Sequence, residues 1–137
     1  MNLSTDTIDV LKNFSNINQN ILVKPGKTVQ TISTMKNILA EAEIKEEFSS
    51  EFAIYDLPEF LRSIELFDSP SLNFNGGANV TIKEEKSKQN IKYFFADKSV
   101  IVAPTKTIAM PDKFVSFAFK KESFAKLMKA ATTLNLV

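Results

Sequence analysis

The sequence contains three segments with apolar residues at helical spacing, and each needs another structure to cover one face. The clearest stripe consists of Leu57, Phe60, Leu61, Ile64 and Phe67. Asp56 is suited to cap this helix, and Pro58 fits its first turn, where an N–H has no intrahelical partner. Because helices in proteins are stabilised mainly by packing such a stripe, the chain must supply a covering sheet or helix.

Two further helices flank this one in the sequence. Residues 5–17, capped by Ser4 or Thr5, place Ile8, Leu11, Phe14 and Ile17 on one face. Residues 122–134 form the third helix, whose inward side chains are expected to be Phe124, Leu127, Met128, Ala131 and Leu134. All three helices carry polar residues on the opposite face, which is typical of helices that cover one side of a globular core.

Short apolar runs between the helices predict strands. They cover residues 21–23, 28–33, 38–44, 52–55, 71–75, 80–84, 91–96, 100–103 and 114–119. Asn75-Gly76-Gly77 predicts a hairpin turn, and residues 104–111 read as an extended linker. The order predicts an α+β fold, followed after the linker by one strand and one helix that begin a second unit.

The composition excludes many kinds of active site. The 137 residues include no histidine and no cysteine, so the usual general base, thiol nucleophile and zinc ligands are missing. A carboxylate enzyme would need paired acids, but neighbours such as Glu84 and Glu85 point to opposite faces of a strand. No apolar run reaches the roughly 18 residues that span a membrane. We therefore expect a cytoplasmic protein that is not an enzyme and has no catalytic residue, metal or cofactor.

Positive charge is concentrated near the end of the chain, although the net charge is only +1. Residues 104–137 contain six lysines against Asp112 and Glu122, whereas residues 1–103 contain more acids than bases. Lys121 lies at the start of the third helix, where a cation is unfavourable against the helix dipole. Lys126 and Lys129 lie opposite its apolar stripe. An external anion such as phosphate would explain these lysines, and a solvated surface is the simpler alternative.

The first two helices carry weaker signals of the same kind. Lys12, Asn13 and Asn16 can offer one cation and several amide donors to a phosphate backbone, and Arg62 offers another cation. Neither helix has the dense Arg, Asn and Gln display that reads base edges in a major groove. If nucleic acid is the ligand, the contact is with the backbone and without sequence reading. A solvated face again remains the alternative.

Several stretches resemble the sliding clamp, or DNA polymerase processivity factor, of large tailed bacteriophages. They are Leu3-Ser4, Asp6-Thr7, Leu11-Lys12-Asn13-Phe14, Ile17-Asn18, Ala53-Ile54-Tyr55-Asp56-Leu57 with Phe60-Leu61, and Val102-Ala103-Pro104 with Lys106, Ile108 and Pro111. The similarity is weaker over residues 25–50 and 70–95. The resemblance implies a first clamp domain at 1–103, an interdomain connector at 104–113 and the start of an incomplete second domain at 114–137.

The resemblance also implies a mechanism. Helices on one face of antiparallel sheets would line a ring, a trimer in this family, around double-stranded DNA. Lys12, Asn13, Asn16, Arg62, Lys121, Lys126 and Lys129 would then face the phosphates, giving a basic inner surface and an acidic outer wall. A replicative DNA polymerase and a clamp loader would be the protein partners.

Two sets of residues are candidates for protein contacts. Ile108 and Met110 in the connector are candidates for a partner-binding pocket or a subunit seam, or else they cover the edge of the core. Ile91, Tyr93 and Phe95 belong to an expected edge strand, which is suited to extend the sheet across a subunit boundary. The alternative function is a non-enzymatic α+β module that binds a peptide or small ligand, whose binding would survive neutralisation of Lys121, Lys126 and Lys129.

Overall fold

The computed structural model describes residues 1–84, 87–105, 112 and 115–136. The chain forms two compact units, Met1–Lys106 and Thr107–Val137. The first unit contains α1 (Thr5–Ser15), β1 (Ile21–Val23), β2 (Gly26–Ile32), β3 (Leu39–Phe48), β4 (Phe52–Ile54), α2 (Leu57–Glu65), β5 (Pro70–Phe74), β6 (Asn79–Glu84), β7 (Asn90–Phe94) and the short 3-10 helix η1 (Lys98–Val100). The described residues of the second unit contain α3 (Lys121–Thr133).

The predicted caps begin both helices of the first unit. The Ser4 hydroxyl accepts a hydrogen bond from the Thr7 amide at 3.3 Å, which makes Ser4 the cap of α1. The Asp56 carboxylate accepts from the Glu59 amide at 2.8 Å and caps α2, with Pro58 in the first turn as predicted. These bonds satisfy amide groups that have no partner within the helix.

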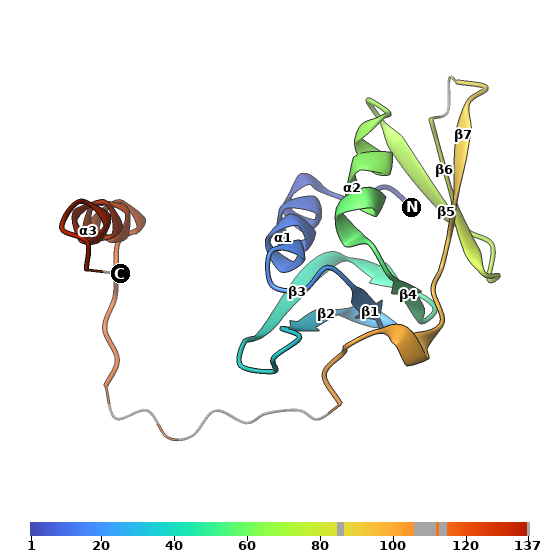
Figure 1. Ribbon diagram of the computed structural model, residues 1–137. Helices are drawn as coiled ribbons and strands as arrows, with labels where there is room; N and C mark the ends of the chain where they lie inside the picture. The colour runs from blue at the N-terminus through green and yellow to red at the C-terminus, as the bar shows by residue number, and fades with distance from the viewer. Residues whose placement is uncertain (85–86, 106–111, 113–114, 137) are drawn as a thin grey trace. The chain divides into compact units, whose positions relative to one another are not determined.

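The strands of the first unit pair in antiparallel fashion. β1 pairs with β4, β2 with β3, and β5, β6 and β7 form a three-stranded sheet in that order. Figure 1 shows α1 and α2 side by side, with β1 to β4 beneath them. The predicted α+β architecture with antiparallel sheets is therefore confirmed.

The core lies between the two helices and the strands. The predicted stripes of α1 and α2 are buried through Leu11, Phe14, Leu57, Phe60, Leu61 and Ile64. Phe52 lies at the centre of an aromatic cluster, with its ring centroid about 5 Å from those of Phe48, Phe74 and Phe95. Edge-on and offset ring contacts of this kind are favourable beyond the apolar area that they bury.

Two predicted strands are wrong. Val100 ends η1, and residues 101–103 after it form no strand, because side chains rather than a neighbouring strand bind the backbone of Val102. Residues 115–119 of the predicted strand 114–119 have no regular structure, and Phe114 lies outside the described residues. A single extended segment is not stable as a strand unless another strand pairs with it.

The third helix forms where predicted, but its apolar stripe is not buried. Phe124 is 54% exposed, Leu127 57% and Leu134 65%. Phe119, just before the helix, packs the edge of its ring against Phe124 at 6.0 Å. The predicted interior position of these side chains is therefore not found among the described residues of this unit, because none of its described elements covers the stripe.

Candidate DNA-facing surface

The predicted phosphate contacts of the first unit lie on the exposed faces of two adjacent helices. Lys12 and Asn13 are exposed on α1, Asn16 caps its C-terminal end, and Arg62 is exposed on α2. The structure therefore brings together residues that are about 50 positions apart in the sequence. None of their side chains belongs to the buried core.

Lys12 does not present a free ammonium on this surface. Its Nζ lies 2.6 Å from Oε1 of Glu65, so the ion pair joins α1 to α2. Each side chain is 49% exposed. The hydrogen bond and the charge of Glu65 raise the pKa of Lys12 above its ordinary value. Sequence reasoning missed this partner because the two residues belong to different helices.

The helices α1 and α2 together contain more acids than bases. Their charged residues are Asp6, Asp9, Glu59 and Glu65 against Lys12 and Arg62. Lys45 of β3 pairs with Asp6 at 2.5 Å, which offsets only one of these acids. The basic inner surface implied by the resemblance stays a prediction, and this helix pair adds no excess of positive charge to it.

A carboxylate from β3 fixes the start of α1. Glu46 accepts hydrogen bonds from the Ser4 amide and from the Thr7 hydroxyl. Burial disfavours the charged form, but the bonds from Thr7 and Ser4 outweigh it and hold the pKa of Glu46 below its ordinary value. Nothing in the sequence distinguished this glutamate from Glu41, Glu43 and Glu47 on the same strand.

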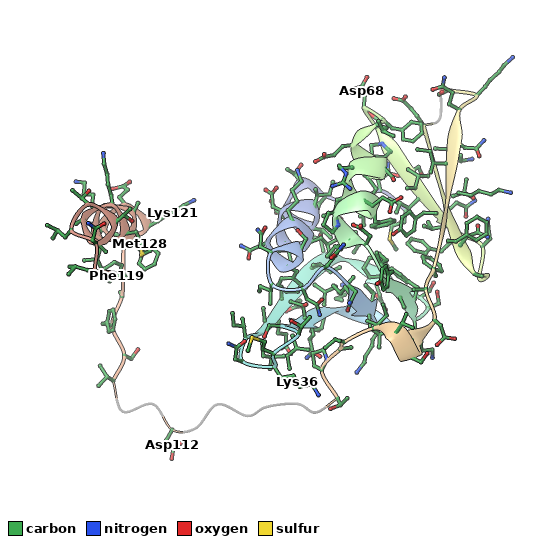
Figure 2. The ribbon with its side chains drawn as sticks, in the orientation of Figure 1. Lys36, Asp68, Asp112, Phe119, Lys121 and Met128 are labelled. Carbon is green, nitrogen blue, oxygen red and sulfur yellow. The ribbon has the colours of Figure 1, made fainter. Side chains whose placement is uncertain are left out.

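Residues 115–136, which contain α3, are strongly basic. On or beside α3 there are four lysines and one acid, Glu122. The lysines are Lys120, Lys121, Lys126 and Lys129. Figure 2 shows Lys121 and Met128 on this helix, with Phe119 just before it. The Lys120 side chain makes no capping hydrogen bond, so the first turn of α3 combines unpaired amides with lysine charge. This combination suits an anionic ligand.

The predicted interface residues Ile91 and Tyr93 of β7, and Phe95 just after it, point toward the core of their own domain. Ile91, Tyr93 and Phe95 are half-buried and pack against the core cluster. The Tyr93 hydroxyl donates to the Asp56 carbonyl at 3.1 Å. Burial raises the pKa of Tyr93 above its ordinary value. On the opposite face, Phe94 is 69% exposed. In the described sheets β7 pairs only with β6, so it is an edge strand as predicted.

Asparagine side chains hold the segment that leads into the connector. Asn18 Nδ2 donates to the carbonyls of Ile32 at 2.8 Å and Val102 at 3.0 Å, and the Val102 amide donates to Asn20 Oδ1 at 3.0 Å. The run of asparagines after α1 was the only sequence signal for this contact. Ile108 and Met110, the predicted connector contacts, lie outside the described residues.

The described residues show no cluster of three or more His, Cys, Asp or Glu side chains that could hold a metal ion. No helix within the described ranges is long and apolar enough to cross a membrane. The remaining features are two helices backed by antiparallel sheets, an edge strand and a basic third helix.

Comparison with known protein families matches residues 4–103 to a family described as DNA polymerase processivity factor. The chain belongs to this family. The matched range contains α1, α2 and β1 to β7, so the processivity-factor assignment covers nearly all of the first unit.

Curated relatives extend the similarity along the chain. The sliding clamp of Escherichia phage RB69 is 35% identical and that of Vibrio phage KVP40 is 34% identical, each over 99% of this chain. The sliding clamp of Enterobacteria phage T4 is 33% identical, also over 99%. The chain spans about three fifths of the length of these relatives, 59%, 62% and 59% respectively.

Proposed function

We propose that this chain supplies the first domain (1–103), the connector (104–113) and the opening of the second domain (114–137) of a DNA sliding clamp subunit. A ring of complete subunits would encircle duplex DNA and tether a replicative polymerase to it. The observation that carries the proposal is the family match over 4–103, which coincides with two adjacent helices backed by antiparallel sheets. The relatives named sliding clamp support the same function.

DNA contact in this proposal is with the phosphate backbone. Lys121, Lys126 and Lys129 on α3 supply the main positive charge, and Lys12, Asn13, Asn16 and Arg62 supply secondary contacts. Mobile lysines that contact phosphates favour no base sequence, so movement along the duplex changes the energy little. Topological enclosure rather than affinity would then keep the protein on DNA.

Assembly and partner binding form the second part of the proposal. The free edge of β7 would pair with a neighbouring subunit, because an unpaired strand edge is a template for sheet extension. The expected assembly is a trimeric ring that a clamp loader opens. Ile108 and Met110, which the sequence made candidates for a partner-binding pocket, a subunit seam or the edge of the core, would contribute to docking of the polymerase.

The test is retention on circular DNA. The complete subunit that contains this chain is incubated with a nicked circular duplex, with and without the loader and polymerase of its phage, and is then challenged with high salt. A clamp remains on the closed circle and is lost when a restriction enzyme linearises it. Salt-sensitive binding that is equal on circular and linear duplexes would contradict enclosure, and native mass measurement would report the oligomeric state.

Charge variants separate clamp function from a peptide-binding module. Changing Lys121, Lys126 and Lys129 together to Gln keeps helix propensity similar but removes three cations. A clamp should bind the duplex more weakly, and the dependence of its log affinity on log salt concentration should become shallower by about 2.7, which is roughly 0.9 per lost phosphate contact. A peptide module would retain its binding. Circular dichroism controls for folding of the variant.

A further inference from the structure

The Lys12–Glu65 ion pair is exposed on the proposed DNA-facing surface rather than sealed within the fold. Its 2.6 Å contact joins α1 and α2, and both partners remain half-exposed. Asp9, three residues before Lys12, adds a second negative charge near the ammonium. Phosphate could therefore reach this cation, but two carboxylates of the same chain already stabilise it.

We propose that Glu65 competes with DNA phosphate for Lys12, so that contact of this face with the duplex requires exchange of the ion pair. This inference rests on the proposed function, because it concerns the same helices. Carboxylate and phosphate oxygens accept from the same ammonium donors. The exchange replaces one ionic contact by another, and the net gain from DNA binding at Lys12 is small.

The basic third helix provides the contrast. All three ion pairs found among the described residues lie in the first unit, and none involves a lysine of α3. Lys126 and Lys129 therefore need not release a protein carboxylate before they contact phosphate. The two units would share DNA contact unequally, with adhesion from α3 and a weakly adhesive surface from α1 and α2. Glu65 is thus a positioning residue that lowers adhesion at its own face.

The experiment compares two variants of α2 that remove the same charge. Glu65→Gln removes the partner of Lys12, whereas Glu59→Gln removes an exposed acid of the same helix that is not in an ion pair with Lys12. Binding of the full chain to a short labelled duplex is followed by fluorescence anisotropy over a range of salt concentrations. Lys12→Gln and the double variant Lys12→Gln/Glu65→Gln complete a double-mutant cycle.

We expect Glu65→Gln to tighten duplex binding about two- to fivefold, the range expected for release of an exposed ion pair. Its salt slope should steepen by about 0.9, corresponding to one added phosphate contact. Glu59→Gln should change affinity less, and Lys12→Gln alone should have little effect. In the double variant the gain should disappear, because no ammonium remains to be released.

Other results would overturn the proposal. Equal gains from Glu65→Gln and Glu59→Gln, unaffected by Lys12→Gln, would show that only the overall charge matters. A large loss in the double variant relative to the native chain, where no unpaired Glu65 charge remains, would show that Lys12 already contacts phosphate in the native chain. A different result would show that the proposed clamp function itself is wrong. In that case the native chain would show no salt-dependent duplex binding, and the variant with all three lysines of α3 replaced would bind no differently from the native chain.

Discussion

Replacing Asn18 with alanine should destabilise the first unit and release the start of the connector. The side chain is only 3% exposed and takes part in three hydrogen bonds: to the carbonyls of Ile32 and Val102 and from the amide of Asn20. Each is worth about 0.5–1.5 kcal/mol net. Together they predict a loss of about 1.5–4.5 kcal/mol in the free energy of unfolding, measured by urea titration.

Two variants test the cause of that loss. Asn20→Ala removes only the acceptor for the Val102 amide, so it should cost about 1 kcal/mol and increase hydrogen exchange at that amide. Asn18→Asp keeps the size of the side chain but replaces its amide donor with an acceptor, which would face two carbonyl oxygens. It should be more destabilising than Asn18→Ala at neutral pH, and less so in acid, where the protonated carboxyl can donate.

A loss below about 1 kcal/mol in the free energy of unfolding for Asn18→Ala would refute the reasoning. Removing three buried hydrogen bonds should cost more than this if they hold the segment around Val102. Asn18→Asp equal in stability to Asn18→Ala would also refute the assigned donor role. Unchanged exchange at Val102 in Asn20→Ala would show that the connector is held by other contacts.

Two further predictions concern stability. Glu46→Gln should lower the free energy of unfolding at pH 7 by about 1 kcal/mol. Because the pKa of Glu46 is depressed in the folded state, this difference should be present above the ordinary carboxyl pKa and should vanish as the pH falls through the folded pKa. Thermal melts across the acid range would measure it. A constant difference down to the lowest pH would contradict it. Gly76 has φ +68°, so Gly76→Ala should lower the free energy of unfolding by about 1 kcal/mol, whereas Gly77→Ala in the same turn should lower it less. Both sites have open space for a Cβ. Equal losses of stability in urea titrations would therefore rule out backbone conformation as the cause.

The sequence predicted the elements whose signals are local. The stripe of α2, its cap at Asp56 and the hairpin turn at Gly76 each depend on residues within one element or turn, and the structure contains all three. Helix boundaries differ by one or two residues, as is usual where helix ends fray.

Features that depend on distant contacts were missed. The expected strand at 100–103 had the right composition, but Asn18 and Asn20 bind its backbone from more than 80 residues away. In the same way, Lys12 looked like a free cation because Glu65 is distant in the sequence. Side-chain pairing between elements sets the charge of the surface, and periodicity within an element contains no information about it.

Tyr93 links the two surfaces that the proposal assigns to different partners. Its ring packs edge-on against Phe60 of α2, and its hydroxyl binds the Asp56 carbonyl, which also accepts the first backbone bond of that helix from Phe60. A displacement of β7 therefore acts directly on the first turn of α2. In the proposed ring, a force from a neighbouring subunit on the edge of this sheet would be transmitted to a helix of the proposed DNA-facing surface. Opening the ring at β7 would then also disturb the helices that line it.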